Sequence, residues 1–145
     1  MRHESFLICI CAILSFQLSQ AKAEESLKVE LQNFLVVEND GGEVLQETDE
    51  AQPGDVILYR AEFRNQSGGP LTNLRPSLPI PDILAYLEET VTPQPDRVLV
   101  EGNETLSFED WKESQQSVRS FEWHLPELSE GEIFVVELRA LFPAE

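Results

Sequence analysis

Acidic side chains gather in two neighbouring stretches of the chain, and carboxylate oxygens are the ligands that calcium prefers. The six candidate metal ligands are Glu38, Asp40, Glu43, Glu47, Asp49 and Glu50. The first three surround a Gly-Gly pair at positions 41–42, and the last three form a second acidic loop. Neither stretch has the alternating ligand spacing of an EF-hand. A bound calcium ion is therefore one hypothesis, and two solvated acidic loops are the other.

One aromatic residue is a candidate for contact with a ligand. Trp111 lies between charged residues in the segment 108–112, which predicts an exposed ring. An exposed ring can stack on a sugar or contact a partner. Trp123 and Tyr59 instead share the apolar phase of their strands, so we expect both in the core.

No group of residues fits the roles of a catalytic site. His124, the only histidine after residue 23, lies in the phase opposite its apolar neighbours, and no Gly-x-Ser-x-Gly motif accompanies it. Carboxylates are numerous, but nothing indicates a pair held in a cleft, as glycoside hydrolysis requires. The sequence therefore predicts a protein that is not an enzyme, with no catalytic and no cofactor-binding residues apart from the candidate calcium ligands.

The elements that must position these side chains are strands. After a Pro53-Gly54 turn, Ile57, Tyr59 and Phe63 alternate with charged residues, which is typical of a strand with one buried face. The same period of two recurs over 27–37 and 132–142. A hairpin signal at 39–42 and a short return arm at 43–46 follow the first of these strands.

Shorter segments complete the pattern. We expect further strands or loop arms at 71–78, 97–100, 105–108 and 120–125, with turn signals about every ten residues. Segment 82–89 is compatible with a short helix or an irregular strand, and we favour a strand or extended loop. The sequence predicts an all-β fold: an immunoglobulin-like antiparallel β-sandwich of about seven or eight strands, in a single domain over residues 24–145.

The first residues have the three-part pattern of a secretory signal peptide. Arg2 and His3 precede an apolar run over 6–16, and a small-x-small site ends at Ala23. The run is too short to span a bilayer. We therefore expect residues 1–23 to be a signal peptide and the product to be periplasmic or secreted. Cys9 and Cys11 both lie in this segment, so the mature chain would contain no disulfide.

The charge balance is strongly acidic. The chain has 27 acidic and 10 basic residues, a formal net charge of −17. Removal of residues 1–23, which carry two basic residues and one acidic residue, makes the domain more negative still. Such a domain repels phosphate backbones, so nucleic acid is not an expected partner. Because no second long apolar run follows, we expect no membrane insertion after signal cleavage.

Several motifs, taken in order, resemble a known family. They are the Pro53-Gly54-Asp55 turn with Tyr59, then Asn65, Pro70 to Leu74, Leu78-Pro79, Tyr86, Val100 to Phe108, and Leu125-Pro126 to Glu132. Together they resemble the bacterial "conserved repeat domain" family of unknown function. The resemblance implies an immunoglobulin-like module of a secreted or surface protein, with no catalytic residues. Family members often hold tandem copies, whereas this chain holds one, and a spacer role is therefore in doubt.

These observations favour an exported, non-catalytic interaction module that presents loops or edge strands to a protein partner in the periplasm or at the cell surface. The long strands Leu27–Val37 and Glu132–Phe142 are the expected edges. The alternative is a carbohydrate-binding or calcium-dependent adhesive module that uses Trp111 and the acidic loops.

Overall fold

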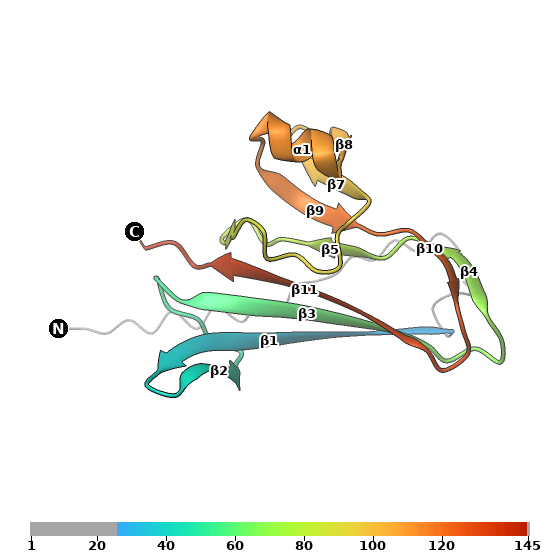
Figure 1. Cartoon of the computed structure of the whole chain (residues 1–145), viewed down its shortest axis with the longest axis horizontal. Helices are drawn as coiled ribbons and strands as arrows, with labels where there is room; N and C mark the ends of the chain where they lie inside the picture. Colours follow the sequence, from blue (N-terminus) through green and yellow to red (C-terminus); the bar gives the residue numbers. More distant parts are fainter. Residues whose placement is uncertain (1–25, 145) are drawn as a thin grey trace.

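The computed structural model of the protein describes residues 26–144. It is all-β with antiparallel sheets and one short helix (Figure 1). The elements in chain order are β1 (Leu27–Asn39), β2 (Gly42–Glu47), β3 (Val56–Asn65), β4 (Leu71–Leu74), β5 (Ser77–Pro79), β6 (Ala85–Tyr86), β7 (Arg97–Val100), β8 (Thr105–Ser107), α1 (Phe108–Ser114), β9 (Val118–Glu122), β10 (Leu125–Leu128) and β11 (Ile133–Leu141).

The largest sheet has the strand order β2-β1-β3-β11-β6. Its centre is β3, the strand predicted after the Pro53-Gly54 turn, which pairs with β1 on one side and β11 on the other. The turn forms as expected: Gly54 has φ +93°, and Asp55 N–H donates to Gln52 O at 3.0 Å. The three long strands predicted from alternation are thereby confirmed, and they lie side by side in the order β1-β3-β11.

A second sheet, in the order β5-β9-β7-β8, faces the first (Figure 1). The helix α1 lies beside β7 and β8 of this second sheet. A two-stranded sheet of β10 and β4 lies at one end of the molecule. The strands of these two smaller sheets are short, three to five residues each. The structure therefore has a sandwich-like all-β architecture.

The core lies between the two larger sheets, and period-two alternation decides which residues enter it. Ile57, Phe63 and Val136 from the first sheet are fully buried, as is Phe121 from the second. Tyr59 is 3% exposed, and this burial raises the pKa of its hydroxyl to about 12. Both aromatic residues expected in the core, Tyr59 and Trp123, are confirmed there.

Asn65 is the one buried polar residue among the described residues, and it connects the end of β3 to the 67–69 turn and to the end of β10. Its Nδ2 donates to Gly69 O at 2.9 Å and to Leu128 O at 2.8 Å, while its Oδ1 accepts from Ser67 N at 2.9 Å. Because these bonds satisfy both ends of the amide, a buried asparagine is tolerated here.

The strand count differs from the expectation. The described residues form eleven strands rather than seven or eight, because several segments read as loops or single arms pair over only two to four residues. Segment 82–89 contains β6 and no helix, so the strand or extended-loop interpretation is confirmed. The expected arm over 105–108 is a strand only to Ser107, after which α1 begins.

The expected edges are wrong in part. β1 borders β2 along Phe34–Asn39, and Asn33 O accepts from Thr48 N just beyond, so only residues 27–32 have no described neighbour on that side. β11 lies between β3 and β6 and pairs with β6 at Ala140 and Leu141. Alternation reveals which face of a strand is buried but not what pairs along its sides. The return arm predicted at 43–46 is confirmed as β2, but its place at the edge of the sheet was not predicted.

The expected signal peptide, residues 1–23, and both cysteines lie outside the described residues. Within residues 26–144, α1 is far too short to reach across a bilayer, and no other helix occurs there.

Candidate functional site

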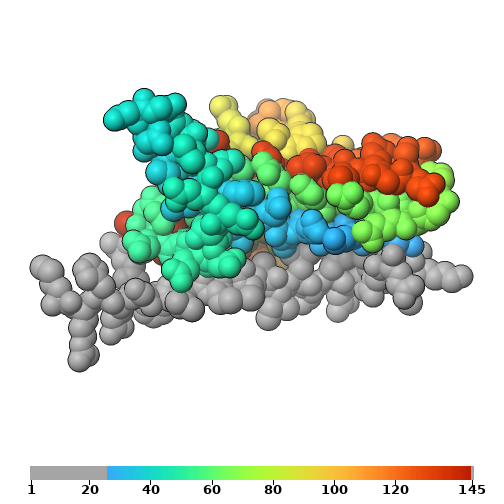
Figure 2. All heavy atoms as spheres, turned by 90° about the horizontal axis from the view of Figure 1, so that it is seen from below, coloured from blue at the N-terminus to red at the C-terminus, as the bar shows by residue number. Residues whose placement is uncertain are grey.

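The β1–β2 hairpin projects from the body of the molecule, as its cyan tip shows in Figure 2. A two-residue turn, Asp40-Gly41, connects Asn39 to Gly42, which are paired. Asn39 Oδ1 accepts from Gly41 N at 2.9 Å, and Gly42 adopts φ +111°, a conformation that residues with a side chain rarely adopt. The hairpin predicted at 39–42 is therefore confirmed in position, but the positive φ falls at Gly42 and not within the Asp40-Gly41 pair.

A pair of charged side chains fastens this hairpin to the outer face of the main sheet. Both terminal nitrogens of Arg139, on β11, donate hydrogen bonds to the carboxylate of Glu43, and the Nη1–Oε2 distance is 2.8 Å. The hydrogen bond from Arg139 lowers the pKa of Glu43, and the same bond raises the pKa of Arg139. A second pair, Arg60 with Glu137 at 2.7 Å, lies on the same face.

The six candidate calcium ligands are all exposed and surround this hairpin. They do not converge: within residues 26–144 no three acidic, histidine or cysteine side chains gather closely enough to hold a metal ion. Glu43 is already engaged by Arg139. The arrangement therefore gives a spread of negative charge around β2 rather than a cage of oxygen ligands.

β2 itself ends the main sheet, since no described strand pairs with its outer side. All six of its residues are exposed. Val44 and Leu45, at 41% and 39% exposure, are two of the five exposed large hydrophobic residues in the described part of the chain. Proline, bulges and covering loops commonly protect edge strands from pairing. β2 has no proline, and its pairing with β1 runs without a register shift.

The backbone of β2 offers pairing groups to the outside. Thr48 N–H donates to Asn33 O at 3.1 Å, so the backbone groups of Thr48 point toward β1. Inward-facing and outward-facing residues alternate in an antiparallel pair. Glu43, Leu45 and Glu47 therefore direct their N–H and C=O groups away from β1. This row of groups can accept one further extended strand.

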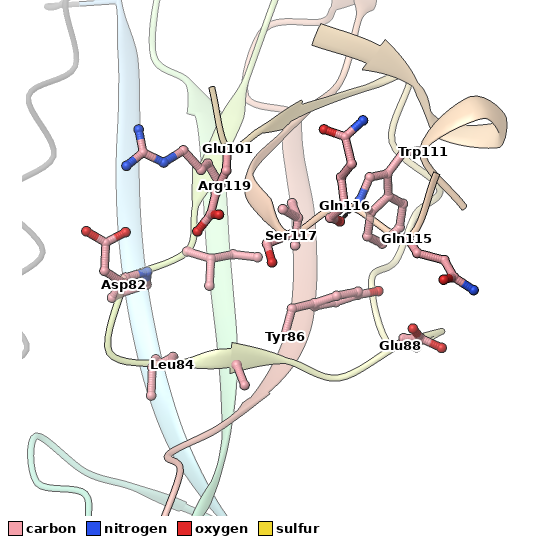
Figure 3. Close-up of a pocket in the computed structure, with 14 residues that line it drawn as sticks. Asp82, Leu84, Tyr86, Glu88, Glu101, Trp111, Gln115, Gln116, Ser117 and Arg119 are labelled. Carbon is pink, nitrogen blue, oxygen red and sulfur yellow. Dashed lines mark hydrogen bonds between the residues drawn. The ribbon is translucent and has the colours of Figure 1, made fainter. Parts of the chain in front are cut away.

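A second candidate lies between the segment around β6 and the end of α1. Two adjoining hollows of about 550 and 650 Å³ share Glu88, Trp111, Gln115 and Gln116 in their walls. Figure 3 shows Tyr86 and Glu88 on one side of the first hollow and Trp111, Gln115 and Gln116 on the other. The surface of the first hollow is mainly polar, whereas that of the second is about equally polar and apolar.

The structure corrects the expectation for Trp111. Its ring is only 9% exposed and packs against Tyr86, Phe108 and Phe121, with ring centroids 5.5 to 5.8 Å apart. Its Nε1–H donates to Gln116 O at 2.9 Å, inside the protein. The flanking charged residues are exposed because successive residues of a helix point in directions about 100° apart around its axis. Trp111 therefore docks α1 on the core and offers no open ring face for stacking.

α1 was missed from sequence, although a signal for it is present. Ser107 is the N-cap: its Oγ accepts from Asp110 N at 3.1 Å and donates to the Asp110 carboxylate at 2.7 Å. This Ser-x-x-Asp arrangement is a form of the capping box. Recognising it would have placed Trp111 on a helix, where burial of one face is expected.

His124 is exposed, as predicted, and is held by polar contacts only. Its ring Nε2 lies 2.9 Å from Asn73 Oδ1, and its backbone N–H donates to Asp96 Oδ2 at 2.7 Å. These contacts fasten the loop between β9 and β10.

No family model matches the chain, and no curated protein and no solved structure matches it either.

Proposed function

We propose that this protein is a non-catalytic interaction module, exported to the periplasm or cell surface, that binds another protein by accepting an extended segment of it along β2. The proposal includes an immunoglobulin-like arrangement of the sandwich and membership of the "conserved repeat domain" family, as the sequence motifs suggest. One observation carries it: β2 is a six-residue terminal strand with outward backbone groups and two exposed aliphatic side chains.

The hairpin is held ready for such a partner. The Arg139–Glu43 pair and the regular β1 ladder fix β2 in an extended conformation before anything binds. Ordering a flexible strand at the moment of binding would cost conformational entropy, and a preformed edge avoids much of that cost. Backbone pairing then supplies affinity, and Val44 and Leu45 supply apolar contact on either face of the new strand.

The hollow near Trp111 supports the carbohydrate alternative less well. Sugar stacking requires an open aromatic face, and the rings there pack against each other. The Tyr86 hydroxyl and the Trp111 indole N–H both already have hydrogen-bond partners within the protein.

The experiment uses the full chain with a photo-crosslinking amino acid at Gln46, an exposed position on β2, in cells that produce the protein. Leu45→Pro removes an outward N–H and leaves the bonds to β1 in place, because proline is tolerated where its nitrogen faces solvent. Leu45→Ala removes the same side chain but keeps the N–H. A crosslinker at Asn103, exposed in the β7–β8 turn, is the matched control.

We expect a discrete adduct from position 46, weakened by Leu45→Ala and lost in Leu45→Pro. The proposal fails if the adduct persists in Leu45→Pro, if position 103 gives the same adduct, or if position 46 gives none.

A further inference from the structure

We infer that the segment accepted by β2 is basic at one end and apolar in its middle: an extended stretch of a partner protein with Lys or Arg facing the Glu47 end of the strand. This inference rests on the proposed function and specifies the chemistry of the partner. It follows from how charge and apolar surface are distributed along β2 and around its two ends.

The apolar part of the match comes from the middle of β2. Val44 and Leu45 are adjacent, so their side chains project from opposite faces of the sheet. Side chains directly opposite each other on paired strands are close enough to interact. A partner strand that carries two consecutive apolar residues at this point covers both exposed side chains at once.

The charged part of the match is asymmetric. Glu43 is neutralised by Arg139, which grips its carboxylate. Among the described residues, Glu47, Asp49 and Glu50 form no ion pair, and all three are exposed. Thr48, which lies between Glu47 and Asp49, bonds through its side chain to the backbone of Glu50. The Glu47 end thus has three exposed carboxylates without an ion pair in the described structure, against two at the turn end, Glu38 and Asp40. A strand with basic residues at the Glu47 end therefore gains the greater attraction.

A second copy of this chain fits the edge poorly. A two-fold antiparallel pair of β2 strands centred on Leu45 places Glu43 of each copy opposite Glu47 of the other. Because Glu43 is already paired with Arg139, Glu47 of one copy meets no free cation on the other copy. Each copy also carries a net charge of −17, which adds long-range repulsion. The occupant is therefore a different protein with positive charge.

The test measures binding of three capped peptides to the full chain by fluorescence anisotropy, at low and at high salt. The first is Lys-Thr-Lys-Thr-Val-Val-Thr, which in antiparallel pairing sets its lysines toward Glu47 and Val-Val beside Val44 and Leu45. In the second both lysines are serine, and in the third both are glutamate. On the protein side, Glu47→Lys reverses the charge at the edge, and Glu104→Lys, on a remote exposed residue, is the matched control.

We expect the lysine peptide to bind about tenfold more tightly than the glutamate peptide at low salt, as a few solvent-exposed charge pairs allow. Added salt should narrow this gap. Glu47→Lys should abolish or reverse the preference, Glu104→Lys should leave it, and Leu45→Pro should remove binding of every peptide.

Failure of the inference and failure of the proposed function give different results. Equal binding of the serine and lysine peptides, lost in Leu45→Pro, overturns the basic partner and leaves strand addition standing. Binding unaffected by Leu45→Pro overturns both. Absence of peptide binding overturns the inference, and a dimer in solution that Leu45→Pro dissociates shows that the occupant is a second copy.

Discussion

In the α1 region and in the β1–β2 hairpin, the exposure of apolar side chains is the opposite of what the local sequence suggests. Trp111 stands among charged residues and yet is 9% exposed, whereas Val44 and Leu45 stand on a regular strand and yet are 41% and 39% exposed. The difference lies in what packs across from each. Trp111 meets Tyr86, Phe108 and Phe121, while nothing in the described part of the chain covers the outer side of β2. Apolar residues in a core stabilise the fold, and apolar residues left at an edge are available for binding.

The largest effect that this contrast predicts is at Trp111. Trp111→Ala should destabilise the protein by about 3–5 kcal/mol, because it empties the contact between α1 and the core. Chemical denaturation measures the change, and Trp111→Phe, which retains an aromatic ring, should cost clearly less. A Trp111→Ala variant with unchanged stability would show that this ring is not part of the core.

Removal of the helix cap should cost less. Ser107→Ala leaves the Asp110 backbone N–H without its acceptor and should lower the free energy of unfolding by about 1 kcal/mol. Ser107→Asp, which restores a capping oxygen, serves as the control in the same denaturation series. If Ser107→Ala and Ser107→Asp proved equally stable, the cap would not hold α1.

Polar replacements at the edge should scarcely change stability. Val44→Thr with Leu45→Thr places β-branched side chains, which suit an exposed strand, at both positions and should alter the free energy of unfolding by less than about 1 kcal/mol. The same pair should strongly weaken crosslinking from position 46. A destabilisation as large as that of Trp111→Ala would mean that these side chains belong to a core, and the contrast between the two regions would collapse.

The smallest expected effect is a local response of the hairpin to acid. Because the folded-state pKa of Glu43 lies below its ordinary value of 4.5, its pair with Arg139 contributes fully above that value and is lost as pH falls through the lowered pKa. Amide hydrogen exchange in β2 should therefore quicken in acid relative to β3, after correction for the intrinsic rates. Glu43→Gln should quicken it already at neutral pH, with no acid step left. An acid response retained in Glu43→Gln would assign the effect to another group.

Much of the main sheet was readable from sequence. Period-two alternation identified β1, β3 and β11 and the buried face of each, and the Asp40-Gly41 and Pro53-Gly54 turns were placed correctly. These predictions succeeded because a strand with one buried face must alternate, and tight turns need particular residues. The acidic character around β2 was equally visible, although it was interpreted as a possible calcium site.

Three features depended on the folded chain. The order of strands left β2 at the edge and enclosed β11, because hydrogen bonding along a strand's sides is independent of which face is apolar. The contact between Arg139 and Glu43 joins residues far apart in sequence, and only the curl of the hairpin brings them together. The burial of Trp111 required α1 to lie over the core. Local sequence thus determined conformation and facing, whereas long-range packing decided exposure, and the proposed function depends on exposure.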